Sequence, residues 1–510
     1  MKRRDILLSI GSLVAFTGCH AEISKKPNII FILADDMGYG DVSALNKESG
    51  INTPHIDQIA DKGVVLTNAH SSSSVSTPTR YGILTGRYNW RSTLKRGVLH
   101  GYDKALITPE RTTMASMLKE QGYETACIGK WHLGWTWHRA GNEPDSVDFT
   151  KSISDGPTAI GFDYFYGIAA SLDMPPYVYV ENDLPTALPD RISSGKGMQM
   201  WRKGPTAQDF NHRETLSHLI DKAVAYIDNR TKNKPFYLYL PLPAPHTPIL
   251  PDEQFQGKSG LNSYGDFVME VDHMVGRIIE TLKDNGLEEN TLLVFTSDNG
   301  CSPASQIEEL QKKGHYPSYI YRGHKADLYE GGHRIPCIIQ WPMQIKPHTV
   351  DQTVCLTDFM ATFAAVSGYE MKDNEAEDSF NLLPLLTNLS DQKMIREATV
   401  HHSIRGEFAL RRGDWKLLLS PSSGGWSFPR PGKDDTIIQT LPEIQLYNLK
   451  TDPGETNNVS KENPDIVREI RDIMIRYIRD GRSTPGIPQK NEGSPEWSDQ
   501  LIEHWMRITN

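Results

Sequence analysis

A continuous apolar run, Asn28-Ile-Ile-Phe-Ile-Leu33, follows Lys25-Lys26-Pro27 near the start of the chain. Its β-branched residues and its lack of alternation favour a strand that is buried on both faces, as in a sheet covered by helices. Helix-like and strand-like segments then alternate. We expect helices over 55–62, 113–121, 215–228 and 264–285, and strands over 124–128, 236–240 and 291–296. This alternation predicts an α/β fold with a mostly parallel sheet flanked by helices.

The pattern changes beyond about residue 390. Residues 408–419 predict a β-hairpin with its turn at Gly413-Asp414, residues 445–449 a further strand, and residues 464–479 an amphipathic helix. The stretch 420–435, rich in Ser, Gly and Pro, predicts a long loop. We therefore divide the chain into an export segment (1–23), a catalytic domain (24–390) and a smaller C-terminal α+β subdomain with an antiparallel sheet (391–510).

Composition narrows the class of function. The 510 residues are 38% hydrophobic and 23% charged, as in soluble globular proteins, and the net charge is -10. A negative chain is a poor binder of nucleic acids or membrane surfaces, because both attract a basic field. An anionic substrate would need a local positive site. The cysteines beyond the export segment fit no metal-binding spacing and are expected to be buried thiols: Cys127, Cys301, Cys337 and Cys355.

The N-terminus has the features of an export signal. Lys2, Arg3 and Arg4 precede the apolar run 6–16, which is shorter than the about 20 residues of a membrane-spanning helix. A plain secretory signal and a lipoprotein signal with a lipid anchor at Cys19 both fit this pattern, and Arg3-Arg4 also fits a twin-arginine signal. Each alternative predicts an exported protein in the periplasm or at the outer membrane, with membrane contact only through the anchor.

Polar residues follow two of the predicted strands. Asp35-Asp36 come after the first strand, and Asp298-Asn299 come after the strand over 291–296. Ligands of open α/β sheets bind at the carboxyl ends of the strands. Three carboxylates and one amide oxygen favour Ca²⁺ or Mg²⁺ over zinc. Ordinary strand-end turns would also explain either pair by itself.

The segment Ser76-Thr-Pro-Thr-Arg80, continuing into Leu84-Thr-Gly-Arg87, resembles the signature of type I sulfatases. The resemblance implies an alkaline-phosphatase-like fold and a Ser76 that is oxidised to formylglycine, whose hydrate offers a geminal diol as nucleophile. A serine at this position implies the subclass matured by an anaerobic radical enzyme. Taken alone, the serine-rich run 71–76 could instead be a flexible loop.

Other family positions match in order: Gly129-Lys-Trp-His-Leu-Gly134, Pro245-His-Thr-Pro248, and Lys325 ahead of Glu330-Gly-Gly-His-Arg-Ile-Pro336. The resemblance implies that Lys130 and Lys325 bind sulfate and that His132 contacts the formylglycine hydroxyl. It also implies that His246 protonates the leaving oxygen and that Arg80 holds the modified residue. The implied calcium ligands are Asp35, Asp36, residue 76, Asp298 and Asn299.

The opening Asp35-Asp-Met-Gly-Tyr-Gly-Asp41 and the run Gly331-Gly-His-Arg334 resemble the arylsulfatase A and N-acetylgalactosamine-6-sulfatase branch. This implies a sulfated glycan substrate, with exo action on galactose or N-acetylgalactosamine sulfate, at O6 as the first choice. We expect sugar contacts from Asp173, His212 and Trp505, although Trp505 could equally pack the terminal helix against the core.

Two other functions stay open at this stage. One is a phosphodiesterase or phosphonate hydrolase of the same superfamily, although the combination of Lys130, His132, His246 and Lys325 fits sulfate better. The other is a non-catalytic glycan-binding lipoprotein in which Ser76 is never oxidised. The intact signature around Ser76 speaks against the second.

Overall fold

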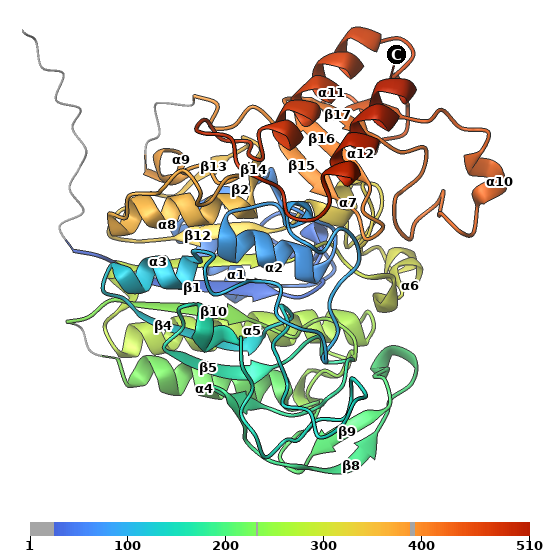
Figure 1. The fold of residues 1–510 in the computed structure, drawn as a ribbon. Coiled ribbons are helices and arrows are strands. Elements are labelled where there is room, and N and C mark those ends of the chain that lie inside the picture. The colour runs from blue at the N-terminus through green and yellow to red at the C-terminus, as the bar shows by residue number, and fades with distance from the viewer. Residues whose placement is uncertain (1–24, 231–232, 388–392, 510) are drawn as a thin grey trace, which may run out of the picture.

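The computed structural model describes residues 25–230, 233–387 and 393–509 and is built around one large sheet between two layers of helices (Figure 1). The strands of this sheet, in spatial order, are β13 (His348–Val350), β2 (Val64–Leu66), β12 (Cys337–Gln340), β11 (Thr291–Ser297), β1 (Asn28–Ala34), β10 (Phe236–Pro241), β4 (Glu124–Lys130), β5 (Tyr164–Ile168), β6 (Val180–Glu181) and β7 (Leu184–Pro185).

The middle of the sheet is parallel. β1 pairs in parallel with β11 and β10, β10 with β4, and β4 with β5. β10 and β11 are buried along their whole length, and β1 is buried after its first residue. This confirms the strands predicted from continuous apolar runs, because a strand covered on both faces has no solvent side to carry polar residues. Near one edge, β12 runs antiparallel to β11 and β2.

Helices cover both faces of the sheet. In Figure 1, α4 and α5 lie on one side, and α2, α3 and α8 lie on the other. The predicted helices form with shifts of a residue or two at their ends. The helices of this part of the chain are α1 (Pro54–Lys62), α2 (Ser76–Thr85), α3 (Met114–Glu120), α4 (Thr215–Asp228), α5 (Ser263–Asp284), α6 (Ile307–Lys312), α7 (Glu330–His333), α8 (Phe359–Ser367) and α9 (Leu383–Thr387).

A second, antiparallel sheet forms near the C-terminus from β15 (Thr399–His402), β16 (Phe408–Arg412), β17 (Trp415–Leu418) and β18 (Gln445–Asn448). The predicted hairpin turn is confirmed. Gly413 has φ of 57°, a left-handed conformation that glycine adopts without steric cost. Helix α11 (Pro464–Arg479) packs on β16 and β17, and α10 (Asp435–Ile438) and α12 (Pro495–Ile508) complete this region. Two short ribbons pair elsewhere: β3 (Ala69–His70) with β14 (Val354–Cys355), and β8 (Pro189–Ser193) with β9 (Gly204–Ala207).

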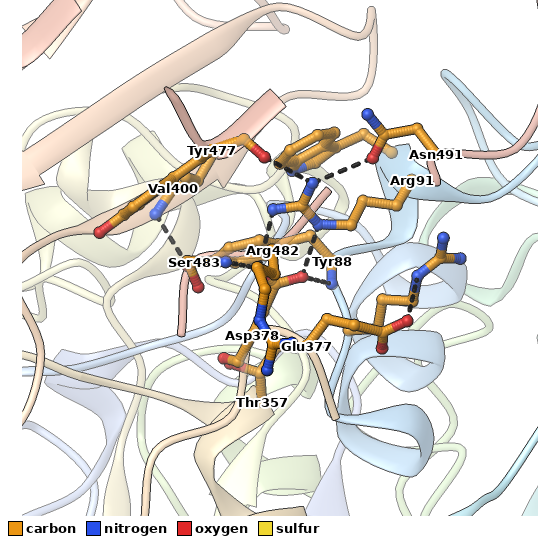
Figure 2. Close-up of polar contacts among 12 residues, drawn as sticks. Tyr88, Arg91, Thr357, Glu377, Asp378, Val400, Tyr477, Arg482, Ser483 and Asn491 are labelled. Atoms are coloured by element: carbon orange, nitrogen blue, oxygen red, sulfur yellow. Dashed lines mark hydrogen bonds and ion pairs between the residues drawn. The ribbon is translucent and has the colours of Figure 1, made fainter. Parts of the chain in front are cut away.

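A buried ion pair joins the C-terminal segments to the segment that follows α2 (Figure 2). The Arg91 guanidinium donates to both carboxylate oxygens of Asp378 at 2.8 and 2.9 Å. It also donates to the Tyr477 carbonyl at the end of α11 and to Asn491 in the tail. Asp378 further accepts from the backbone N–H of Ser483. These bonds fix α11 and the chain that follows it against the region after α2.

Within the described residues, no helix is long and apolar enough to cross a membrane. The export segment and Cys19 lie outside those residues. The remaining cysteines are buried free thiols, as predicted: Cys127, Cys301, Cys337 and Cys355.

Candidate active site

The predicted site residues converge where neighbouring parallel strands end. β11, β1, β10 and β4 lie side by side and point the same way, so the segments after them meet at one edge of the sheet. Asp35-Asp36 follow β1, Asp298-Asn299 follow β11, Lys130 ends β4, and His246 lies in the loop after β10.

Ser76 is the first residue of α2 and lies at the centre of this group. Its hydroxyl is 3.3 Å from Asp35 Oδ1 and 3.4 Å from Lys130 Nζ, and the residue is 2% exposed. The positive end of the α2 dipole favours negative charge at this position. The serine-rich run before it is packed, because the hydroxyls of Ser71 and Thr79 both donate to the carbonyl of Ser73. The run is therefore not the flexible loop that its composition allowed.

Arg80 holds two sides of the site together. One turn into α2, its guanidinium donates to Asp298 Oδ2 at 2.7 Å and to the carbonyl of Lys130 at 3.0 Å. Burial opposes the charge, but Asp298 and Asp35 raise the pKa of Arg80 above its usual value. Arg80 therefore stays charged and ties α2 to the ends of β11 and β4.

The acidic residues and Asn299 have the donor set of a hard-cation site. Asn299 Nδ2 donates to Asp36 Oδ1 at 2.7 Å and to the Gly300 carbonyl, which fixes the amide. Its Oδ1 is buried and has no hydrogen-bond partner in the described structure. Oxygen atoms of Asp35 and Asp36 and a ring nitrogen of His246 lie within 4.8 Å of one another. An unpaired amide oxygen beside buried carboxylates fits Ca²⁺ or Mg²⁺.

Two lysines face the same carboxylates. Lys130 Nζ is 2.6 Å from Asp35 Oδ2, and Lys325 Nζ is 2.6 Å from Asp36 Oδ1. Burial would raise the pKa of Asp35, but Lys130, His246 and Arg80 hold that pKa below its usual value. Burial lowers the pKa of Lys130, whereas Asp36 and Asp35 outweigh burial and raise that of Lys325. The lysines therefore lie beside the candidate cation site, where they could hold an anion.

His132 is kept neutral and in one tautomer. Its Nε2 lies 2.7 Å from the Leu99 carbonyl, an acceptor, so Nε2 carries the hydrogen. Its Nδ1 is buried without a partner among the described residues and has a free lone pair. Burial, and then the charges of Lys130 and Arg80, hold the pKa of His132 well below its usual value. His132 is therefore a neutral ring whose Nδ1 can accept a hydrogen bond.

His246 lies nearer the solvent. Its Nδ1 is 2.5 Å from the Thr247 carbonyl and so carries a hydrogen, which leaves Nε2 to face the site, 3.6 Å from Asp36 Oδ2. Asp173 Oδ1 is 4.0 Å from His246 Nδ1 and has no hydrogen-bond partner among the described residues, whereas Oδ2 pairs with Arg202. His246, Asp173 and Lys325 keep side-chain exposures of 7–10%. They mark the side from which the site opens.

The other two predicted sugar contacts have different positions. His212 stacks on Trp201 with ring centroids 4.1 Å apart, beside a cavity of about 590 Å³. Its ring also lies 4.5 Å from that of Tyr177, whose hydroxyl donates to the Asp173 carbonyl. The prediction for Trp505 is wrong. Its indole is 2% exposed and packs edge-on against Phe408 in the C-terminal core.

A second histidine cluster, formed by His70, His333 and His401, lies near the C-terminal sheet and is fully buried. His70 and His333 are joined through their Nδ1 atoms at 2.9 Å, and Lys416 Nζ lies 3.0 Å from His333 Nε2. To bind a metal ion, the ring nitrogens need lone pairs that are not used in hydrogen bonds, and the surrounding charges must favour a cation. Here the Nδ1 atoms of His70 and His333 are bonded to each other, and the nearby carboxylate of Glu330 is paired with Lys416. These contacts give the cluster a structural role.

A family model for sulfatases matches residues 27–369. Over 92% of its length, the chain is 34% identical to an N-acetylgalactosamine-6-O-sulfatase of Bacteroides thetaiotaomicron, of which the match covers 98%. The chain belongs to the sulfatase family. This sulfatase is also 29% identical to human arylsulfatase A, with 92% of this chain and 90% of the relative covered. The family predicted from the Ser76 signature is confirmed, and the enzyme is a sulfuric ester hydrolase.

Solved structures agree with this assignment. One from work on glycosaminoglycan metabolism by Bacteroides thetaiotaomicron has a TM-score of 0.78 and 34% identity, and the match covers 88% of the sulfatase and 99% of that chain. A sulfatase from Pseudoalteromonas sp. has a TM-score of 0.68 and 25% identity, with 89% and 90% covered. The predicted alkaline-phosphatase-like fold is confirmed.

Sequence reasoning missed several residues that shape the sulfatase site. Arg202 pairs with Asp173, and the Leu99 carbonyl orients His132. Thr247 Oγ1 is buried near the opening without a partner among the described residues. Backbone carbonyls leave no mark in a sequence. Arg202 could have been suspected only as one more basic residue in the segment that carries Asp173 and His212.

Proposed function

We propose that this sulfatase is exported and removes sulfate from glycans, acting from a chain end on galactose or N-acetylgalactosamine with O6 as the preferred position. The nucleophile is formylglycine made from Ser76, and His246 is the general acid. The observation that carries the proposal is the position of Ser76, whose hydroxyl lies between Asp35 and Lys130 at the positive end of α2. The curated relative named for the 6-O-sulfate of N-acetylgalactosamine supports the choice of sugar.

Position 76 needs the modification because a serine hydroxyl is a weak nucleophile at neutral pH. Oxidation of the Ser76 side chain removes two hydrogens and leaves an aldehyde, and water adds to it as a geminal diol. One hydroxyl attacks the sulfur while the bond from sulfur to the sugar oxygen breaks. The other hydroxyl then loses its proton, the aldehyde re-forms, and sulfate leaves. An anaerobic radical enzyme is the maturation partner that a serine precursor implies.

The basic side chains offset the charge of the ester. Arg80, Lys130 and Lys325 are buried opposite Asp35, Asp36 and Asp298, so their fixed charges cancel in the protein alone. A divalent cation, held by those carboxylates, Asn299 and residue 76, would supply net positive charge and polarise a sulfate oxygen. We propose Ca²⁺, with Mg²⁺ as the alternative. Lys130 and Lys325 would then orient the sulfate in a site screened from water.

The two histidines divide the proton transfers. His246 Nε2 faces the site from its open side. With hydrogens on both ring nitrogens, His246 would give the Nε2 proton to the sugar oxygen as it leaves, because an alkoxide is a poor leaving group, and would keep the hydrogen on Nδ1 that Thr247 accepts. His132 is neutral with Nδ1 free, and it would accept the proton of the second hydroxyl as sulfate is expelled. The position of His246 at the opening suits the acid, and the free lone pair on His132 Nδ1 suits the base.

The sugar would bind where buried polar atoms have no partner in the described structure. Asp173 Oδ1, His212 Nε2 and Thr247 Oγ1 are such atoms, and unpaired buried groups are rare unless a ligand or water satisfies them. A sugar presents several hydroxyls that can pair with them. Trp201, stacked on His212, adds an aromatic face nearby.

A comparison of substrates tests the reaction and the position together. We expect the matured, calcium-loaded protein to release sulfate from N-acetylgalactosamine 6-sulfate faster than from the 4-sulfate, and to leave an activated phosphodiester almost intact. Asp173→Asn should lower the rate of hydrolysis of the sugar sulfate and leave that of an activated aryl sulfate unchanged. Asp190→Asn, an exposed change in the same segment, is the matched control. Faster cleavage of the phosphodiester than of any sulfate would replace the proposal with a phosphoester hydrolase.

A further inference from the structure

Asp36 has an unusual backbone conformation. Its φ is 66°, in the left-handed region that costs free energy for residues other than glycine. Its backbone N–H donates to Asp298 Oδ1 at 3.2 Å, and its carboxylate accepts from Asn299. The conformation therefore aims this carboxylate at the candidate cation site. The carbonyl of Asp36 also needs a contact that keeps the residue in this conformation.

Tyr264 supplies that support. Its hydroxyl, on α5, lies 3.2 Å from the Asp36 carbonyl and 2.5 Å from Asp41 Oδ2. The residue is 1% exposed. Tyr264 is separated by more than two hundred residues from Asp36 in the chain, and its hydroxyl reaches the backbone of Asp36, not its carboxylate.

Asp41 and His315 orient the tyrosine in turn. Asp41 accepts from Tyr264, from the backbone N–H of Gly38 at 2.7 Å and from His315 Nε2 at 2.8 Å. The backbone N–H of Gly50 donates to His315 Nδ1, which therefore has no hydrogen of its own. His315 Nε2 must then carry one and donate to Asp41. Both residues are fully buried. Because the Asp41 carboxylate can only accept, Tyr264 must direct its one hydroxyl hydrogen mainly to Asp41, and the same hydroxyl makes the longer contact with the Asp36 carbonyl.

We propose that Tyr264, Asp41 and His315 are positioning residues that preset Asp36 for the divalent cation. The inference rests on the proposed function, because it requires a cation at Asp35, Asp36, Asp298 and Asn299. Tyr264 contacts the carbonyl of Asp36 and not its carboxylate, and Asp41 and His315 act on Asp36 through Tyr264. Within the described residues, no hydrogen bond or ion pair joins these three residues to Lys130, Lys325 or Ser76. Their loss should weaken cation binding first and alter catalysis only through it.

The test is the calcium affinity of the full-length, matured protein, measured by titration calorimetry after chelation. Tyr264→Phe keeps the ring and removes the hydroxyl that lies between Asp41 Oδ2 and the Asp36 carbonyl. We expect the dissociation constant for Ca²⁺ to rise about tenfold to a hundredfold, as for other losses of support behind metal ligands. Activity at saturating Ca²⁺ should recover most of the wild-type kcat, which a simple loss of fold would not allow.

Matched variants separate positioning from general destabilisation. Tyr179→Phe also removes a buried tyrosine hydroxyl bond, to Thr215, and should leave the calcium affinity unchanged. His315→Asn should weaken binding because its shorter amide cannot reach Asp41, whereas His315→Gln should restore a donor near the Nε2 position and with it the affinity. The two variants of His315 test the inference by themselves if Tyr264→Phe does not fold.

Equal calcium affinities in wild type, Tyr264→Phe and His315→Asn would overturn the inference and leave the proposed cation site standing. Absence of calcium or magnesium binding by the wild-type protein would overturn both the inference and the proposed cation site.

Discussion

Lys130 Nζ lies 2.6 Å from Asp35 Oδ2, and neither side chain is exposed to solvent. One residue ends β4 and the other follows β1, so the pair joins the part of the site suited to an anion with the part suited to a cation. A buried charge that loses its partner is costly. The effect of removing Lys130 therefore depends on what else can neutralise Asp35.

Lys130→Met should abolish most sulfate hydrolysis without weakening calcium binding. The lysine would hold the ester, and loss of one such preorganised group costs about 10²- to 10³-fold in rate. Because Asp35 then has no lysine to pair with, its attraction for a divalent cation is undiminished. Hydrolysis rates and calcium calorimetry on the same preparation check both halves. A parallel loss of calcium binding would place Lys130 in a structural role.

His246→Ala should distinguish substrates by their leaving groups. For a sugar sulfate, loss of the general acid is expected to lower kcat by about 10²- to 10⁴-fold. An activated aryl sulfate needs no protonation of its leaving oxygen and should lose far less. The measurement is kcat for both substrates with wild type and variant. Equal losses would remove His246 from the role of acid.

His402 gives a prediction about pH and stability. Burial lowers the pKa of His402 to about 4, from an ordinary value of 6.5. Below pH 6.5 the unfolded chain gains a proton at this residue that the folded protein rejects, so the free energy of unfolding falls as the pH falls from 6.5 to about 4. His402→Leu should remove this contribution, about 2 kcal/mol between about pH 7 and about pH 5. Urea unfolding at both pH values measures it, and an unchanged pH dependence would contradict the prediction.

The Arg91 and Asp378 pair should stabilise the fold without acting in catalysis. Arg91→Met leaves Asp378 buried and short of a cation, so we expect the free energy of unfolding to fall by about 3–5 kcal/mol. Arg507→Met breaks an exposed pair with Glu443 and should cost less than about 1 kcal/mol. Urea denaturation compares the two variants. A small effect of Arg91→Met would mean that water or a neighbouring side chain replaces the guanidinium.

The sequence predicted the parts of the fold that depend on local patterns. β1, β10 and β11 are apolar runs, and α4 and α11 have regular helical patterns. Helix α2 was not predicted, because all of its residues, polar and apolar, are buried and they do not divide into an exposed polar face and a buried apolar face. The antiparallel direction of β12 was not predicted either, since it depends on contacts with strands far away in the chain.

In the site, too, the residues that follow local patterns could be predicted, and those that depend on distant contacts could not. Residues after parallel strands, such as Asp35 and Asp298, could be brought together by a rule about sheet edges. The sugar contact expected from Trp505 was wrong, because the sequence around a tryptophan does not show whether its indole packs in the core or stacks on a sugar. Tyr264 and His315 could not be found at all, since their role depends on one hydroxyl and one ring nitrogen meeting Asp36 and Asp41 across the fold.

The most direct test of the account is the mass of the tryptic peptide 63–80, which contains Ser76, from protein produced with an anaerobic maturation enzyme and assayed for sulfate release in the same preparation. The account predicts a mass about 2 units below that of the unmodified peptide, as expected for oxidation of the serine nucleophile to an aldehyde. It also predicts a rate of sulfate release that rises in proportion to the modified fraction. Full sulfate release by protein whose Ser76 is entirely unmodified would contradict it.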